Sequence, residues 1–359
     1  METMNVIERT TELAEHAPVV IKKTRSVAPK KVVNEADVSV SVLIVTYNSA
    51  SLIDALLSRM HAEMLASRGE IIVVDNASHD QTADVVRERH PWVKLIESPV
   101  NLGFAAANNL GAQHARGDVL LLLNPDAVPC MGAIEQGIHL MRQHPEVALA
   151  GGRLVDEQGC DQPSARMFPN FLRELFTLSG LAAKFPASRL LGGLDRTWAR
   201  PDEAAIVDWV PGAFALVRRQ VFQELGGFDE RFFMYYEEVD LCRRIKAMGL
   251  QVAYWPELLV QHIGGASAKT VEGLDVSSSG SQLSHWRVRS GLLYYRKNHG
   301  LLVTALIHGL ERGWHVLRAR RATWRGQEAK AASSLKHVAL LKRAWSETMG
   351  GRVTPPRPW

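Results

Sequence analysis

Cysteine is scarce in this sequence of 359 residues, and long uninterrupted apolar runs are missing from it. Its three cysteines, Cys130, Cys160 and Cys242, are far apart and form no C-x-x-C pair. This pattern argues against a disulfide framework or a structural zinc site and is typical of a reducing compartment. No stretch approaches the about 18–20 apolar residues of a spanning helix, and residues 1–40 lack the apolar segment of a signal peptide. We therefore expect a cytoplasmic protein, in contact at most with the inner face of a membrane.

Glycine is absent from the first loop in which a dinucleotide-binding domain would need it. A Rossmann domain requires G-x-G-x-x-G after its first strand, whereas residues 45–51 read VTYNSAS. The sequence therefore argues against a dehydrogenase of that class. The chain has 42 Lys and Arg and 38 Asp and Glu, so charge of neither sign dominates. The small positive excess says little about binding partners.

Apolar runs alternate with helical segments over residues 38–126. The runs contain many β-branched residues and are apolar throughout; they cover residues 38–48, 70–78, 93–99 and 118–126. The segments between them have helical spacing and cover residues 49–64, 80–90 and 103–115. Fully apolar strands separated by helices indicate an α/β fold with a mostly parallel central sheet and helices on both faces.

The rest of the chain is organised differently. After about residue 150 the pattern is α+β, with a long insertion rich in Arg and Leu at residues 163–205. A Gly/Ser-rich linker follows at 271–282, and residues 283–345 have helical spacing. We therefore expect a flexible arm at 1–37, a catalytic or binding domain at 38–270, and a linker with a basic helical region at 271–359.

Polar residues follow the apolar runs, where ligands of parallel sheets bind. These residues are Thr46, Asn48, Asp75, Asn76, Asn101 and Asp126. An acid at such a strand end can accept a hydrogen bond from a ribose hydroxyl or hold a Mg²⁺ ion between two phosphates. For Asp126, capping a turn is the alternative. For His262, which precedes two glycines, the alternatives are a metal ligand and an ordinary packed histidine.

Carboxylates and aromatic residues are crowded together in the segment FFMYYEEVDLCRR. Favourable acids at a helix start would account for Glu237 and Asp240. That explanation does not account for the flanking aromatic residues, which could form a wall for a sugar ring. Crowding and partial burial raise the pKa of a carboxyl group, which suits Glu237 or Glu238 to act as a general base.

Five motifs together resemble those of inverting family 2 glycosyltransferases of the GT-A fold, in particular the bacterial rhamnosyltransferases. The motifs are VSVLIVTYNSASLI, IIVVDNASHDQT, NLGFAAANNLG, LLLLNPDA and VPGAFALVRRQVFQELGGFDERFFMYYEEVDLCRR. The resemblance spans about residues 39–265, in order, and implies a GT-A-type nucleotide-diphospho-sugar transferase with a helical C-terminal extension. A processive synthase is not expected, because spanning helices and a Q-x-x-R-W motif are absent.

The resemblance also assigns roles to individual residues. It implies that the nucleotide-sugar is bound by Thr46, Asn48, Asp75, Asn101, Gly103, Asn108 and Asn124. Asp126 matches the last residue of the D-x-D metal motif and, with His262, would bind Mg²⁺ or Mn²⁺. Asn124 replaces the first acid of that motif. Trp209, Gly212 and Ala213 would border the acceptor.

The implied reaction is a single in-line displacement with inversion, in which Glu238, or alternatively Glu237, is the base. We expect transfer of rhamnose from dTDP-rhamnose to a hydroxyl of a glycan or lipid-linked acceptor in cell-surface polysaccharide biosynthesis. The alternatives are a different UDP- or GDP-sugar, or a non-catalytic nucleotide-sugar-binding assembly protein.

Arg and Lys alternate with Trp, Leu and Val in the C-terminal region, residues 285–345. Its tryptophans are Trp286, Trp314, Trp324 and Trp345. The pattern fits a helix pair packed on the catalytic domain or a helix lying on an anionic membrane. It also resembles a nucleic-acid surface, but no known binding module is present, so we expect no nucleic-acid partner.

Overall fold

The computed structural model describes residues 40–263 and 281–355. These residues belong to one compact unit, Val38–Trp359. The arm expected at 1–37 and the linker expected at 271–282, up to residue 280, lie outside the described residues.

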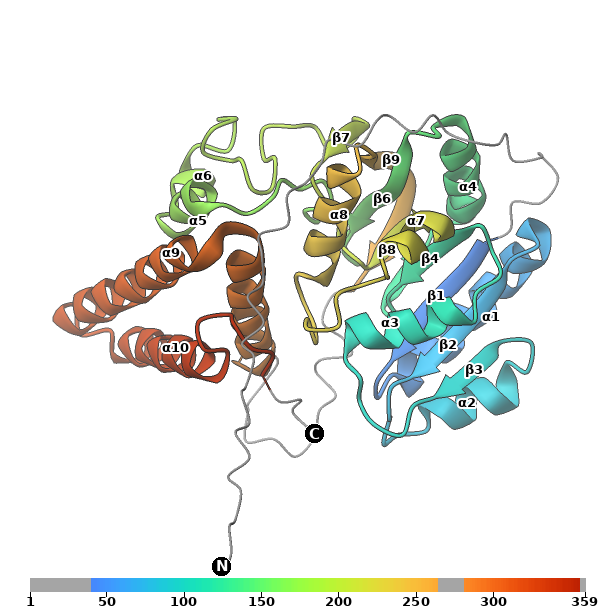
Figure 1. The fold of residues 1–359 in the computed structure, drawn as a ribbon, viewed down its shortest axis with the longest axis horizontal. Coiled ribbons are helices and arrows are strands. Elements are labelled where there is room, and N and C mark those ends of the chain that lie inside the picture. The colour runs from blue at the N-terminus through green and yellow to red at the C-terminus, as the bar shows by residue number, and fades with distance from the viewer. Residues whose placement is uncertain (1–39, 264–280, 356–359) are drawn as a thin grey trace, which may run out of the picture. The chain divides into compact units, whose positions relative to one another are not determined.

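The expected alternation of strands and helices in the first part of the chain is confirmed (Figure 1). The elements are β1 Val40–Thr46, α1 Ala50–Ser67, β2 Glu70–Asp75, α2 Thr82–Arg89, β3 Lys94–Glu97, α3 Phe104–Gln113 and β4 Val119–Leu123. Each strand ends where a polar residue follows an apolar run. The polar residues are therefore placed at the carboxyl ends of the strands.

Nine strands of the described residues form one sheet, in the order β3-β2-β1-β4-β8-β6-β9-β5, with β7 also paired to β9. The later strands are β5 Ala127–Pro129, β6 Val147–Val155, β7 Ala205–Val207, β8 Phe214–Arg218 and β9 Gln251–His262. β1, β2, β3, β4, β6 and β9 run in one direction and β5, β7 and β8 in the other. The mostly parallel sheet is thus confirmed, with antiparallel β8 inserted between β4 and β6.

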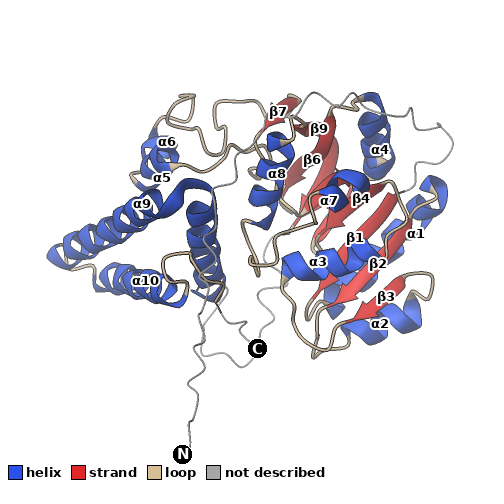
Figure 2. Ribbon diagram, viewed as in Figure 1, coloured by secondary structure: helices blue, strands red, loops and turns tan. Residues whose placement is uncertain are grey.

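Helices cover both faces of the sheet (Figure 2). Alternate residues of each central strand face opposite sides: Leu43 packs in one core cluster, and Val42 and Ile44 pack in the other. The first cluster includes residues of α3, α7 (Arg219–Glu224) and α8 (Glu237–Ala247). The second includes residues of α1, α2 and α4 (Ala133–Gln143). Burial on both faces explains why the strand sequences are apolar throughout.

The insertion at 163–205 carries two short helices, α5 Phe171–Leu178 and α6 Leu181–Lys184. The C-terminal region is helical as expected, with α9 Ser281–Trp324 and α10 Glu328–Glu347 packed together. α9 is interrupted at Gly300, whose φ of 79° is not helical. Before Gly300, α9 contributes Leu293, Tyr294 and Tyr295 to the core cluster that contains α8. Across the described ranges, no helix is long and apolar enough to cross a membrane.

Candidate active site

Asp75 is the centre of a hydrogen-bonded cluster at the carboxyl ends of β1 and β2. Parallel pairing places Thr46 directly beside Asp75, and Thr46 Oγ1 donates to Asp75 Oδ1 at 3.1 Å. The backbone N–H of Ser78 donates to Asp75 Oδ2 at 3.0 Å. Asn48 joins this cluster because its N–H donates to Ser78 Oγ at 2.9 Å, and its Oδ1 accepts from the N–H of His79 at 2.8 Å. The structure therefore brings together the residues predicted to hold the base and the ribose.

Asn101 fixes the loop between β3 and α3. Its Oδ1 accepts hydrogen bonds from Asn76 Nδ2 at 2.9 Å and from the N–H of Gly103 at 3.0 Å. The amide oxygen of Asn76 accepts from the N–H of Leu102 at 2.7 Å. Since Asn76 follows Asp75 directly, this loop is held against the Asp75 cluster.

Gly103 allows this loop to contact the segment that leads into α8. Its φ is +82°, and a Cβ at this position would lie 2.4 Å from the carbonyl oxygen of Phe233. A larger residue would therefore be both strained and obstructed. The adjacent N–H of Phe104 donates to the same carbonyl at 2.7 Å. The loop of the nucleotide side is thereby tied to the segment that carries Glu237 and Glu238.

Asn108 and Asn109 lie side by side in α3 and have different contacts. Asn108 Nδ2 donates to the carbonyl of Phe104 within its own helix at 2.9 Å. Its Oδ1 is buried without a hydrogen-bond partner among the described residues, so its predicted role on the nucleotide stays a prediction. Asn109 exchanges two hydrogen bonds with the backbone of Phe228, at 2.9 and 2.8 Å, and so fixes the loop before α8. Two consecutive asparagines in a helix give no signal of this difference.

Asp126 and His262 meet where β4 and β9 end. Antiparallel pairing of β5 with β9 places Ala127 opposite His262. Asp126 Oδ1 lies 3.5 Å from His262 Nε2, and Asp126 is 4% exposed. The two residues predicted as metal ligands are therefore neighbours. A carboxylate oxygen and an imidazole nitrogen are donors that suit Mn²⁺, and the carboxylate also suits Mg²⁺.

Gln162 sets the orientation of the His262 ring, and the sequence analysis missed it. Gln162 Nε2 donates to the backbone carbonyl of His262 at 2.8 Å. Its Oε1 therefore faces His262 Nδ1, at 2.8 Å, and must accept the hydrogen from that nitrogen. In the neutral ring the proton is therefore on Nδ1, which leaves the lone pair of Nε2 on the side of Asp126. Metal-binding histidines commonly donate the hydrogen of their other ring nitrogen to such an acceptor, so the residues present fit the implied ion.

The residues predicted to border the acceptor lie in the segment between β7 and β8. The N–H of Asn124 donates to the carbonyl of Ala213 at 3.1 Å. Gly212 lies against Phe104, because a Cβ there would be 3.4 Å from that ring. Trp209 is 7% exposed, and the guanidinium of Arg166 lies 4.5 Å above its ring centre. The acceptor contacts of these three residues stay predictions.

Glu237, which is buried, and Glu238, which is half-buried, begin α8. The preceding Tyr235 and Tyr236 have φ of 70° and 67°, a region that residues with side chains rarely occupy. Within the described part of the chain, Oε2 of each glutamate is buried without a hydrogen-bond partner. Burial raises the pKa of both carboxyl groups, and the charge of Glu238 raises that of Glu237 further. The pair is therefore a stronger proton acceptor, when ionised, than exposed glutamates.

Glu238 and Asp240 have different contacts with the positively charged residues around them. Arg166 and Arg287 partly oppose the rise in the pKa of Glu238. Asp240 is fully buried and forms ion pairs with Arg244 at 2.8 Å and Lys297 at 2.7 Å. Its contacts are structural, which leaves the glutamate pair as the candidate for catalysis.

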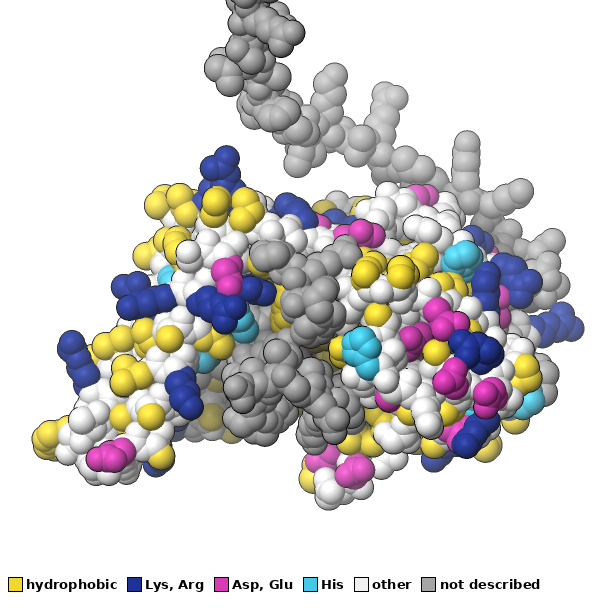
Figure 3. All heavy atoms as spheres, turned by 90° about the horizontal axis from the view of Figure 1, so that it is seen from below, with side chains coloured by type: hydrophobic (Ala, Val, Ile, Leu, Met, Phe, Trp, Pro, Cys, Tyr) yellow, Lys and Arg dark blue, Asp and Glu magenta, His cyan; other side chains and the backbone are white. Residues whose placement is uncertain are grey.

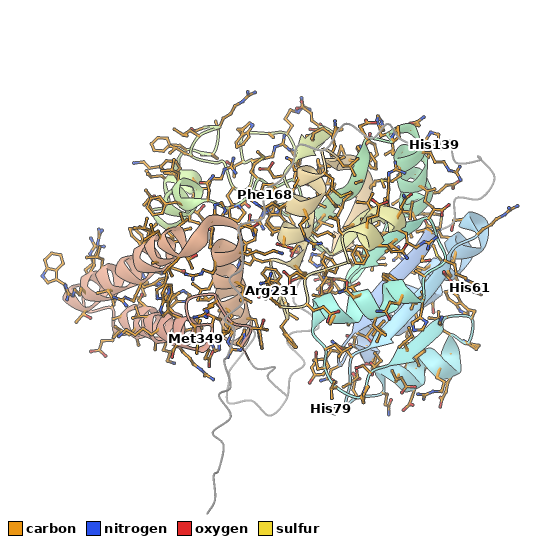
Figure 4. The ribbon with its side chains drawn as sticks, in the orientation of Figure 1. His61, His79, His139, Phe168, Arg231 and Met349 are labelled. Atoms are coloured by element: carbon orange, nitrogen blue, oxygen red, sulfur yellow. The ribbon has the colours of Figure 1, made fainter. Side chains whose placement is uncertain are left out.

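The first part of α9 holds the segment before α8 in place. The Trp286 ring centre lies 4.3 Å from that of Phe233, and Ser290 Oγ donates to the carbonyl of Met234 at 2.7 Å. Lys297 Nζ lies 2.7 Å from Asp229, which also pairs with Arg231, labelled in Figure 4. The first part of the C-terminal extension, the part of α9 before Gly300, thus packs directly against the candidate catalytic segment. No motif in the sequence gave this contact.

The mixed sheet with helices on both faces is the fold of the GT-A class of glycosyltransferases. Residues 41–226 match the sequence profile described as "Glycosyl transferase family 2", so the chain belongs to this family and is a glycosyltransferase.

Named relatives and a solved structure agree with this assignment. An N-acetylglucosaminyl-diphospho-decaprenol L-rhamnosyltransferase of Mycobacterium tuberculosis is 30% identical over 62% of this chain and 75% of its own. The rhamnosyltransferase WbbL of Escherichia coli is 26% identical over 62% of this chain and 83% of its own. The mannosyltransferase PcManGT of Pyrobaculum calidifontis, solved with GDP-Man and Mn²⁺, shares the fold. Its TM-score is 0.50 at 17% identity over 86% of each chain.

Proposed function

We propose that this glycosyltransferase transfers rhamnose from dTDP-rhamnose to a hydroxyl of a lipid-linked glycan, with inversion at the anomeric carbon. Two relatives named as rhamnosyltransferases support the sugar, and the name of one contains a diphospho-decaprenol-linked sugar. One observation carries the reaction type: the buried Glu237–Glu238 segment is bonded to the loop of the nucleotide side through Phe104 and Phe233.

The donor is bound along the carboxyl ends of β1, β2 and β4. Asp75 accepts a hydrogen bond from a ribose hydroxyl or from the pyrimidine imide, and Thr46 and Asn48 shape its surroundings. Asn101, Gly103 and Asn108 close over the nucleotide, and Asn124 lies next to the diphosphate. The clusters around Asp75 and Asn101 support this placement, because their hydrogen bonds hold the side chains before the donor arrives.

Asp126 and His262 would hold Mg²⁺ or Mn²⁺. When bound, the ion neutralises charge on the departing diphosphate, a contribution of several kcal/mol in enzymes of this kind. Gln162 keeps the proton of His262 on Nδ1 and so presents Nε2 as a ligand.

Glu238 is the general base. As the acceptor oxygen attacks the anomeric carbon, its proton passes to the carboxylate of Glu238 and the bond from that carbon to the diphosphate oxygen breaks on the opposite side. A raised pKa makes Glu238 a better base near neutral pH. Arg166 and Arg287 favour its ionised form. Glu237 is the alternative base, and Trp209, Gly212 and Ala213 border the acceptor.

The outer face of α9 after Gly300 contacts an anionic membrane surface in this proposal. Leu302, Leu306, Leu317 and Trp324 are 79%, 61%, 62% and 85% exposed, and helical spacing places them on one face. We call these four residues the α9 apolar face.

Exposed arginines accompany the α9 apolar face at positions 312, 318, 320, 321 and 325. Figure 3 shows apolar and basic side chains intermixed over this helical region. Apolar side chains beside cations suit anionic headgroups and would bring the site to a lipid-linked acceptor.

Trp286 does not belong to the membrane-facing set that the sequence suggested. It is 5% exposed, and its ring packs against that of Phe233. The proposed membrane contact is therefore restricted to the part of α9 after Gly300.

Calorimetric titration with UDP-, dTDP- and GDP-sugars tests the donor and the metal. We expect a dTDP-sugar to bind only with Mg²⁺ or Mn²⁺, and Asp126→Ala to abolish this metal-dependent binding because it removes the carboxylate ligand. Gln162→Leu should lower the affinity for the metal ion by about 10–100-fold, since His262 loses the partner that orients its ring.

Gln158→Leu is the matched control, because Gln158 is exposed in the neighbouring turn and should leave binding unchanged. Binding of another nucleotide class would replace the proposed donor. Binding that ignores both the metal and Asp126 would refute the metal site.

Glu238→Gln tests the base. The amide has nearly the same shape but cannot take the proton, so we expect kcat to fall about 10²–10⁴-fold while donor affinity by calorimetry is unchanged. Glu237→Gln, next to it, should cost much less activity. A larger loss in Glu237→Gln would assign the base to Glu237, and near-normal turnover of both variants would contradict carboxylate base catalysis at this site.

Vesicle sedimentation tests the membrane contact. We expect the protein to sediment with vesicles that contain phosphatidylglycerol and not with pure phosphatidylcholine, and Leu306→Asp with Leu317→Asp to abolish this binding. Leu335→Asp, an exposed position on α10, should keep it. Equal binding of all variants, or preferential binding of DNA over anionic vesicles, would contradict a lipid-facing α9.

A further inference from the structure

A second group of metal-ligating side chains lies between α9 and α10, outside the active site. It consists of Glu311 and His315 on α9 and His337 on α10, and one ligand atom from each lies within 4.8 Å of the others. Glu311 and His315 are four residues apart, so they lie one turn apart on the same face of α9. His337 joins them because α10 packs along α9 (Figure 1).

The three side chains point toward a common position between the two helices. His337 Nε2 lies 3.0 Å from Glu311 Oε1, and the ring centres of His315 and His337 are 4.1 Å apart. All three residues are half-buried, so an ion from solvent can reach them without unfolding the helices.

One nitrogen of this group lacks a hydrogen-bond partner. His315 Nδ1 is buried and bonds to no other described residue. A buried polar atom without a partner costs free energy. A bound cation would use one ring nitrogen of His315 together with the neighbouring imidazole and carboxylate.

We propose that Glu311, His315 and His337 form a binding site for a transition-metal ion of the zinc class, which crosslinks α9 to α10. Two imidazoles and one carboxylate are a known zinc donor set, with the fourth position left to water. Mg²⁺ and Ca²⁺ prefer oxygen ligands throughout, so the two imidazoles select against them.

The ion would complete the attachment of α10. Near its C-terminal end, α10 is already held by Glu347, which pairs with His285 at 3.0 Å and also with Arg289. His337 lies at the middle of α10, where the metal would strengthen the existing contact of His337 with Glu311 in the part of α9 that follows Gly300. The inference depends only on these residues and stands or falls independently of the proposed donor and acceptor.

Equilibrium dialysis with Zn²⁺ alone tests the site in the full chain. Asp126→Ala with His262→Ala first removes the active-site ligands, and we expect one Zn²⁺ per chain to remain bound. Adding His337→Asn, or separately Glu311→Gln, to this variant should lower its remaining affinity for Zn²⁺ by about tenfold or more. His337→Cys keeps a zinc ligand and should retain the ion. His139→Asn, at an exposed position on α4, is the control and should change nothing.

Two further readouts do not depend on zinc content. Co²⁺ in the same protein should give the visible absorption of a tetrahedral nitrogen-ligated ion, which His337→Asn removes. Zn²⁺ should raise the melting temperature of the protein with all three ligands and not that of the His337→Asn variant. Absence of bound Zn²⁺ once Asp126 and His262 are replaced, or zinc binding that His337→Asn and Glu311→Gln leave unchanged, would overturn the proposal.

Discussion

Two carboxyl groups buried at the start of one helix impose the main constraint on this structure. Removing a carboxylate from water costs several kcal/mol, and Glu237 and Glu238 each have a buried oxygen that no described residue hydrogen-bonds. The cost must be offset by packing around them. α3 holds the preceding segment on one side through the N–H of Phe104, and α9 holds it on the other through Ser290. The first part of α9 is therefore structural support for the active site as well as part of a helical extension.

The same segment connects the two halves of the site. Phe233 shares its carbonyl with the start of α3, and α3 follows the loop that Asn101 fixes beside the Asp75 cluster. Asp126 is placed independently of this contact, by the pairing of β5 with β9 that puts His262 beside it. One backbone hydrogen bond thus joins the proposed nucleotide side to the segment of the proposed base, and a separate strand pairing places the proposed metal ligands. Such an arrangement positions two substrates with little reorganisation of the protein.

Local patterns in the sequence predicted the elements from β1 to β4 because fully buried strands and amphipathic helices have distinct periodicities. Thr46 and Asp75 could be predicted because polar residues ending adjacent parallel strands must meet. The direction of β8 could not, since a strand buried on both faces is apolar whichever way it runs. Gln162 could not either, because its partner is 100 residues away and neither residue type marks the contact. Trp286 looked like a surface residue among basic neighbours, and only its packing on Phe233 shows that it is buried.

The pH dependence of kcat/KM for sugar transfer tests the central claim that the buried glutamate pair supplies the base. A base must be ionised to act, and burial raises the pKa of both glutamates, so activity should fall as the pH drops through that raised pKa. We predict an acidic limb above pH 4.3, the approximate pKa of an ordinary glutamate, and its loss in the residual activity of Glu238→Gln. A limb at the ordinary value, or one that Glu238→Gln leaves unchanged, would contradict the account.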